Sequence, residues 1–144
     1  MIISGFAGIG KSTLAKKSYE VIDLESSIFK KNWELYSEIA KYLDEQGYDV
    51  LISAHKEIRT KLHDKGVKYT FVLPPNTEKS KSEYLDRYRL RGNTDSFIYN
   101  MMENWNSYHE ILPWENDVVT LRDGDYLADW YYSIDSYNSV FDRF

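Results

Sequence analysis

The chain has 144 residues, enough for one domain with a hydrophobic core and short for two. Its formal net charge of −5 argues against an extended nucleic-acid surface, and the absence of cysteine excludes disulfides and thiolate metal sites. No apolar run reaches the length needed to span a membrane. We therefore expect a single domain over residues 1–144 that lies in the cytoplasm without a membrane partner.

The first predicted strand, at Ile2 and Ile3, leads directly into the segment Gly5-Phe6-Ala7-Gly8-Ile9-Gly10-Lys11-Ser12. This segment has the complete G-x-x-x-x-G-K-S pattern of a phosphate-binding P-loop, and good helix formers follow it. Glycines in such a loop allow successive backbone N–H groups to face a phosphate at the start of a helix. We expect the phosphates of ATP to be bound by Gly5, Gly8, Ile9, Gly10, Lys11, Ser12 and Thr13.

Two side chains of this motif have distinct chemical tasks. Lys11 is expected to reach the β- and γ-phosphates, and the Ser12 hydroxyl to provide one ligand to Mg²⁺. The strand that would carry a second magnesium-binding acid ends in Ser53 instead. Magnesium would therefore depend on Ser12, phosphate oxygens, water and another acid nearby, for which Asp23 is the candidate.

Strands and helices alternate along the rest of the chain. Apolar runs bounded by turn residues predict strands at 19–24, 48–53, 68–73 and 118–121. Apolar spacings of three and four, with caps and glycine stops, predict the helices. One of these helices passes through Asn32 and Leu43 and is capped by Ser26 or Ser27. The others span residues 55–65, 78–90, 95–112 and 125–132. Residues 133–144 have no assignment.

The alternating order predicts an α/β fold, a three-layer α/β/α arrangement around a parallel sheet of about five strands. Ligands of such sheets bind at the carboxyl ends of the strands. We expect four segments to meet at that edge: Gly5–Ser12, Asp23–Glu25, Ser53–His55 and the residues after Leu73. The stripe Met101, Trp105 and Tyr108 is expected to be core.

Three features resemble the nucleoside monophosphate kinase superfamily, which includes adenylate, shikimate and gluconate kinases. They are the P-loop, the segment Asp23-Leu24-Glu25-Ser26, and the pair Arg87 and Arg91 followed by Gly92. The stretches V-I-D-L-E-S-S, N-W-x-x-Y and G-Y-D-V-L-I-S-A-H-K-E-I-R are similar to small nucleotide-kinase-like proteins encoded by phages of Gram-positive bacteria. This second resemblance implies a location in the host cytoplasm.

The superfamily resemblance implies a P-loop kinase fold with a short lid, here around residues 76–95. It implies that Arg87 and Arg91 stabilise charge on the transferring phosphoryl group and that Arg59 binds the acceptor phosphate. The spacing of four places both lid arginines on one helix face, although a surface ion-pair row with Glu83 remains an alternative. Asp23, His55 and Trp33 complete the expected acceptor site, with Trp33 either stacking on a base or belonging to the core.

The expected reaction is phosphoryl transfer from ATP·Mg²⁺ to a (deoxy)nucleoside monophosphate, which gives the diphosphate. One alternative is a kinase for a small hydroxyl compound or a nucleic-acid 5′ end, in which a carboxylate base such as Asp23 would be essential. The other alternative is a nucleotide-binding module without catalytic activity that binds a partner protein. The sequence does not decide the oligomeric state, and a homodimer is one alternative.

Overall fold

The computed structural model describes the backbone of residues 1–141 and the side chains of residues 1–134. One sheet of parallel strands lies at its centre, in the order β2-β3-β1-β4-β5. The strands are β1 (Ile2–Gly5), β2 (Val21–Asp23), β3 (Asp49–Ile52), β4 (Thr70–Leu73) and β5 (Val118–Thr120). All strands that the sequence predicts are therefore present, and all are parallel.

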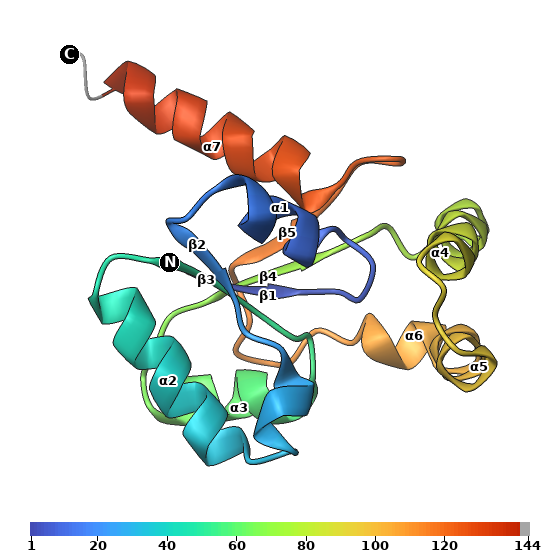
Figure 1. Cartoon of the computed structure of the whole chain (residues 1–144), viewed down its shortest axis with the longest axis horizontal. Coiled ribbons are helices and arrows are strands. Elements are labelled where there is room, and N and C mark those ends of the chain that lie inside the picture. Colours follow the sequence, from blue (N-terminus) through green and yellow to red (C-terminus); the bar gives the residue numbers. More distant parts are fainter. Residues whose placement is uncertain (142–144) are drawn as a thin grey trace.

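Helices cover both faces of this sheet, as Figure 1 shows. On one face lie α2 (Trp33–Glu45) and α3 (Lys56–Asp64), and on the other lie α1 (Lys11–Lys17) and α7 (Leu127–Phe141). Beyond the carboxyl ends of the strands lie α4 (Glu78–Leu90), α5 (Asp95–Glu103) and α6 (Trp105–Tyr108). This arrangement confirms the predicted three-layer α/β/α fold.

The core is divided by the sheet into two apolar clusters. Ile3 and Leu51 are buried on the α1 and α7 side, whereas Ile2, Val50 and Ile52 are buried on the α2 and α3 side. Successive strand residues point to opposite faces, so a strand covered on both sides needs apolar residues at every position. The continuous apolar runs of β1 and β3 satisfy that requirement.

The start predicted for the helix through Asn32 and Leu43, which is α2, is wrong. Ser26 opens a short 3₁₀ helix, η1 (Ser26–Phe29), and α2 is capped instead by Asn32, whose side chain accepts a hydrogen bond from Leu35 N–H at 3.1 Å. Between the two helices Lys30 and Lys31 adopt left-handed backbone angles, with φ of 48° and 63°. This turn separates what the sequence pattern presents as one helix.

The predicted helix over 95–112 is also interrupted. It breaks at Asn104, whose side-chain Nδ2 donates to the Asn100 carbonyl at 3.0 Å. A side-chain amide that bonds to nearby backbone competes with helix continuation, which explains the break. In contrast, α7 continues beyond residue 132 to Phe141, so it includes most of the unassigned segment 133–144. Residues 142–144 lie outside the described residues.

Most of the region predicted as a short lid, 76–95, belongs to α4. Tyr88 on α4 donates from its hydroxyl to the Ala7 carbonyl at 2.8 Å, and the Tyr84 ring contacts Phe6 at 5.9 Å between centroids. These contacts fix α4 to the P-loop, while Leu90 at its end is 88% exposed.

Among the helices that the structure describes, none combines the length and apolar character that crossing a membrane would require.

Candidate functional site

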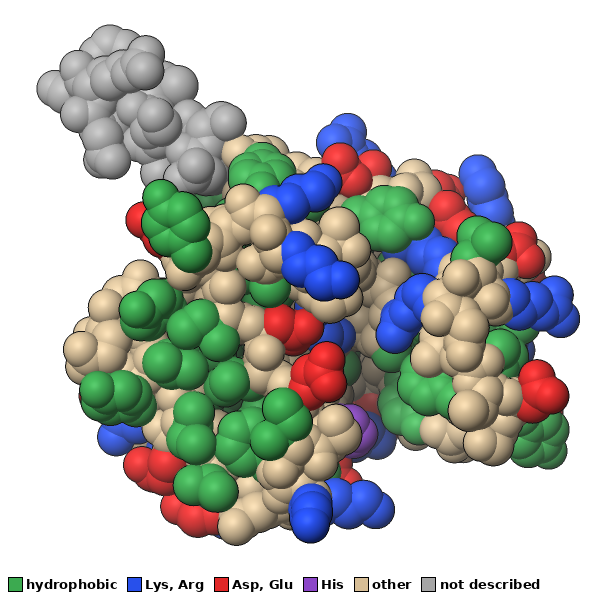
Figure 2. Space-filling model, in the orientation of Figure 1, with side chains coloured by type: hydrophobic (Ala, Val, Ile, Leu, Met, Phe, Trp, Pro, Cys, Tyr) green, Lys and Arg blue, Asp and Glu red, His purple; other side chains and the backbone are tan. Residues whose placement is uncertain are grey.

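A cleft of about 630 Å³ lies at the carboxyl edge of the sheet, between the P-loop, the ends of β2 and β3, and helices α4 and α5. Figure 2 shows this cleft as a hollow between the main body and the lobe of α4 and α5, with acidic and basic side chains along it. Residues of three of the four segments predicted to meet at this edge, Gly5–Ser12, Asp23–Glu25 and Ser53–His55, line the cleft, whereas the residues directly after Leu73 do not. The lining residues are Ala7, Gly8, Gly10, Lys11, Ser12, Thr13, Asp23, Leu24, Glu25, Ser26, Ser27, Ser53, His55, Arg87, Leu90, Arg91, Phe97 and Tyr126.

The P-loop glycines are required by the backbone and by close neighbours. Gly8 and Gly10 have φ of 91° and 100°, backbone angles that residues other than glycine rarely adopt. A Cβ on Gly8 would lie 2.8 Å from Cε1 of Tyr88, and a Cβ on Gly10 would lie 3.2 Å from Cδ1 of Tyr126. The glycines therefore give the loop the conformation of a phosphate cradle and allow it to pack closely against Tyr88 and Tyr126, whose rings an added side chain would meet.

Lys11 lies at the floor of the cleft. Its ammonium donates to the Gly5 carbonyl at 2.5 Å and to the Phe6 carbonyl at 3.3 Å. Burial lowers its pKa to about 8, the Asp23 carboxylate opposes that change, and the Arg91 guanidinium adds to it. A buried ammonium beside the phosphate cradle is well placed to bind an anion, and an anionic ligand would stabilise its charge.

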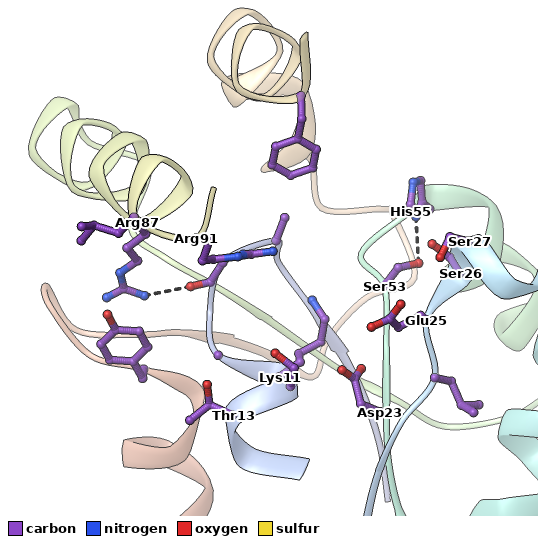
Figure 3. Close-up of a pocket in the computed structure, with 18 residues that line it drawn as sticks. Lys11, Thr13, Asp23, Glu25, Ser26, Ser27, Ser53, His55, Arg87 and Arg91 are labelled. Carbon is purple, nitrogen blue, oxygen red and sulfur yellow. Dashed lines mark hydrogen bonds between the residues drawn. The ribbon is translucent and has the colours of Figure 1, made fainter. Parts of the chain in front are cut away.

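The end of β2 brings carboxylates opposite Lys11, and Figure 3 shows Lys11, Asp23 and Glu25 turned toward the same space. Burial raises the pKa of Asp23, against the lowering influence of Lys11. No cluster of three or more histidine or acidic side chains that could hold a metal occurs among the described residues. Ser12 and Asp23 both line the cleft, so these two oxygen donors fit a Mg²⁺ ion that takes its other ligands from phosphate and water.

Tyr36 on α2 joins the ends of two strands, a role that the sequence did not reveal. Its hydroxyl donates to the Leu24 carbonyl at 2.6 Å and accepts from Ser53 N–H at 2.9 Å. Burial raises the pKa of Tyr36 to about 12, so the hydroxyl keeps its proton at neutral pH. The segments that carry Asp23 and His55 are thereby held side by side.

His55 lines the cleft as predicted, whereas Trp33 does not. The Nδ1 atom of His55 lies 2.8 Å from Oγ of Ser53, and burial lowers the pKa of the imidazole. Trp33 packs instead behind the site, with its ring 5.1 Å from His55 and 6.1 Å from Tyr36 between centroids. The core interpretation of Trp33 therefore fits its position, and the proposed stacking on a base does not.

The two predicted lid arginines have different surroundings. Arg87 is 7% exposed and donates to the carbonyls of Gly8 at 3.1 Å, Asp125 at 3.1 Å and Gly124 at 3.3 Å. Its guanidinium also lies over the rings of Tyr84 and Tyr126, at 4.4 Å and 3.8 Å. Figure 3 shows Arg87 bonded to the loop backbone (dashed line). This group is already used to fasten the P-loop to the segment before α7.

Arg91, one turn further along, remains available. Its side chain lines the cleft and is exposed, and its ring contact is with Tyr88 at 5.9 Å. No hydrogen bond to its guanidinium is found in the part of the chain that the structure describes. Of the predicted pair, Arg91 is thus the arginine that is free to contact a bound phosphate.

Arg59 is not brought into the cleft, which corrects its expected position at the acceptor phosphate. It is 1% exposed, and its guanidinium lies 2.6 Å from the equally buried Glu115 carboxylate. It also donates to the Ala54 carbonyl at 3.2 Å and lies 4.0 Å over the Phe71 ring. The sequence could not show this, because Glu115 lies 56 residues away in a loop.

A second pocket of about 260 Å³ adjoins the cleft and shares Ala7, Lys11, Ser53, His55 and Phe97 with it. The rest of its lining is Gly5, Phe6, Ala54, Asn100, Met101 and Tyr108. The expectation that Met101 and Tyr108 belong only to the core is therefore incomplete. The apolar spacing of Met101 and Tyr108 does not predict a pocket. The polar Asn100, in the same predicted helix, is the sequence feature that indicates one. Tyr126, which covers Gly10, is assigned by the sequence to the predicted helix 125–132, whereas α7 begins at Leu127 and Tyr126 lies before it, against the P-loop.

No family model matches the chain, and no curated protein sequence matches it. Solved structures do resemble it. A gluconokinase from Sinorhizobium meliloti 1021 is 16% identical, with a TM-score of 0.50 over 89% of this chain and 84% of that one. An uncharacterized protein from Eubacterium ventriosum ATCC 27560 is 14% identical, with a TM-score of 0.49 over 96% of this chain and 98% of that one. The chain has a P-loop kinase-like fold.

Proposed function

We propose that this protein is a kinase that transfers the γ-phosphoryl group of ATP·Mg²⁺ to a small acceptor. The observation that carries the proposal is the convergence of a complete P-loop, Lys11 and Asp23 on one cleft that opens into an acceptor-sized pocket. The gluconokinase with a similar fold, itself a kinase by name, is consistent with this reaction class.

The donor half of the site is built around the P-loop. Backbone N–H groups of Gly8 to Ser12 bind the phosphates, and Lys11 moves from the carbonyls of Gly5 and Phe6 to a phosphate oxygen. Ser12 and Asp23 would hold Mg²⁺, which when bound would neutralise charge on the phosphates. Arg91 reaches across the cleft to stabilise charge on the transferring group.

The acceptor that we favour is a (deoxy)nucleoside monophosphate. Its phosphate is already ionised at neutral pH, so it needs to be positioned and screened more than deprotonated. Lys11 and Arg91 are the cations along the cleft that serve this purpose, since Arg87 is engaged by backbone carbonyls and Arg59 by Glu115. His55, whose lowered pKa favours the neutral imidazole, can position the phosphate by a hydrogen bond. The apolar walls of the second pocket suit a nucleobase better than a polyhydroxylated acid.

A hydroxyl compound is the second candidate acceptor, and two observations favour it. Burial raises the pKa of Asp23, which makes this carboxylate a better general base, and the arginine expected for an acceptor phosphate is absent from the cleft. A nucleoside with a free 5′ hydroxyl would occupy the same pocket as its monophosphate. The two candidates therefore differ in the acceptor group rather than in the binding site.

The test is transfer of radiolabelled γ-phosphate from ATP·Mg²⁺ to a panel of nucleoside monophosphates and the matching nucleosides. We expect diphosphate formation, and we expect Asp23→Asn to slow it without abolishing it. Transfer only to nucleosides, abolished by Asp23→Asn, would establish the hydroxyl acceptor instead. ATP binding without transfer to any acceptor would contradict the kinase proposal and favour a non-catalytic nucleotide-binding module.

A further inference from the structure

The second pocket, between β1, the end of β3 and helices α5 and α6, carries a prediction about which substrates the protein accepts. We propose that Asn100 and Tyr108 determine specificity there by binding the carbonyl-bearing edge of a nucleobase, as in thymine, uracil or guanine. This inference rests on the proposed function, since it concerns the acceptor of the same reaction. The amino-bearing edges of adenine and cytosine are the edges that these residues would reject.

The walls of the pocket favour a flat, apolar ring. Phe6, Ala54, Phe97 and Met101 supply apolar surface, and Lys11 is the one lysine or arginine among the lining residues. Phe97 is held in position by an edge-to-face contact with Tyr88, at 5.3 Å between ring centroids. A planar base would gain dispersion and hydrophobic contact on both faces here, whereas a sugar acid would leave its hydroxyl groups without partners.

The orientation of the ligand follows from the residues that the two pockets share. Lys11 and His55 line both of them, so the phosphate of an acceptor would lie at their junction, beside the P-loop. The base would then lie against Phe6 and point toward Asn100 and Tyr108, which line the second pocket but not the cleft. The geometry thus places the reactive end at the donor phosphates and the base at the polar pair.

The hydrogen bonds within the polar pair leave two donors without a partner. Asn100 Nδ2 donates to the Tyr108 hydroxyl at 2.6 Å, and Asn100 Oδ1 accepts from Asn104 Nδ2 at 2.9 Å. The amide oxygen therefore already has one donor and keeps one lone pair. The hydroxyl hydrogen of Tyr108 and the second Nδ2 hydrogen have no partner among the described residues, and both are donors.

Two adjacent donors are complementary to an edge that presents acceptors. The O4 atom of thymine or uracil and the O6 and N7 atoms of guanine are such acceptors, whereas cytosine presents an amino group at the corresponding edge and adenine presents N7 beside an amino group. An amino group opposite these donors would pair with neither of them. Because the Asn100 side chain is exposed, water can satisfy the donors, so the preference comes from the hydrogen bonds that a carbonyl-bearing base gains.

The experiment is calorimetric titration of the full chain, in the presence of a non-hydrolysable ATP analogue and Mg²⁺, with each of five nucleoside monophosphates. These carry thymine, uracil, guanine, adenine and cytosine. We expect the first three to bind about tenfold or more tightly than the last two, which is the range of one well-placed hydrogen bond. Because binding is measured without transfer, the result does not depend on catalysis.

Two variants and a control test the assignment of residues. Tyr108→Phe removes one donor, and Asn100→Asp turns the Tyr108 hydroxyl toward the new carboxylate, so each should lower the preference for carbonyl-bearing bases about tenfold. The control is Tyr99→Phe, on the same helix with a side chain that is 68% exposed, and it should change nothing. If circular dichroism shows that one variant does not fold, the other variant still tests the assignment of the two residues.

The failures of the two proposals are distinguishable. Selective binding without phosphoryl transfer would refute the kinase reaction and support the base site. Transfer to all five monophosphates with equal affinities, or a preference that survives both variants, would refute the base site and leave the kinase reaction standing. Tight binding of gluconate in place of every monophosphate would overturn the nucleobase assignment outright.

Discussion

Arg59 and Glu115 form an ion pair in which both side chains are 1% exposed, with Nη1 2.6 Å from Oε1. Glu115 also accepts from the Tyr69 hydroxyl at 2.7 Å and from Leu112 N–H at 2.6 Å. The pair therefore fastens α3 to the loop that precedes β5. An arginine that sequence reasoning assigns to the substrate is, in the folded chain, part of the scaffold.

Replacement of Arg59 should reduce stability rather than substrate affinity. Arg59→Met leaves the Glu115 charge buried and unpaired, which should lower the free energy of unfolding by about 3–5 kcal/mol. Urea denaturation measures this change. The matched control is Lys56→Met, at another residue of α3. It breaks the exposed ion pair between Lys56 and Glu110 and should have little effect on stability. An unchanged stability with a raised KM for the acceptor would restore Arg59 to the substrate site.

The P-loop glycines give a second prediction, for which the chain contains its own control. Gly8→Ala should abolish detectable ATP binding, because its Cβ would meet Tyr88 at 2.8 Å in addition to backbone strain. Gly47→Ala has the same backbone strain, with φ of 94°, but nothing lies within 4 Å of its Cβ. It should cost only about 1–2 kcal/mol of stability and leave ATP affinity unchanged. Equal ATP binding by both variants would contradict the phosphate cradle.

Arg87 and Arg91 should separate stability from turnover. Arg87→Met removes hydrogen bonds to the Gly8, Gly124 and Asp125 carbonyls, so it should lower the melting temperature and weaken ATP binding together. Arg91→Met removes an exposed side chain, so it should leave the melting temperature unchanged and lower kcat by about 10²–10³. Thermal denaturation and steady-state kinetics measure the two effects, and a reversed pattern would contradict the assignment.

ATP affinity should depend on pH through Lys11. Burial lowers the pKa of this ammonium to about 8 in the free protein, so the group is charged below that pH and neutral above it. Bound phosphate stabilises the charged form, and affinity should therefore fall by about tenfold per pH unit above pH 8. Titration of Lys11→Met should show weak binding without this decline. A pH-independent affinity between pH 7 and 9.5 would contradict the position of Lys11.

The sequence predicts the sheet well because its determinants are local. Continuous apolar runs mark β1 and β3 as strands buried on both faces, and the P-loop pattern predicts the loop between β1 and α1. The start of α4 is predicted with either Asn76 or Thr77 as its cap, and in the structure the cap is Thr77, which accepts from Ser80 N–H at 3.1 Å. Helix boundaries are missed at Asn32 and Asn104, where a polar side chain outcompetes the apolar repeat.

Roles that depend on distant partners are beyond local patterns. The sequence assigns Arg59 to the acceptor phosphate and Arg87 to the transferring phosphoryl group. In the fold, Arg59 is paired with Glu115, and Arg87 is bonded to the carbonyls of Gly124 and Asp125. Tyr108 follows the apolar spacing of a core residue although it lines a pocket. Each side chain has the chemistry for several roles, and only the tertiary contacts select one.

The central claim is that the cleft transfers a phosphoryl group between two bound molecules. The direct measurement is ³¹P NMR of the protein with ATP·Mg²⁺ and a mixture of nucleoside monophosphates, with Lys11→Met as the inactive control. We expect ATP signals to be replaced by those of ADP and a second nucleoside diphosphate, and no change with Lys11→Met. Release of inorganic phosphate alone, or ATP that stays intact with every acceptor, would contradict the account.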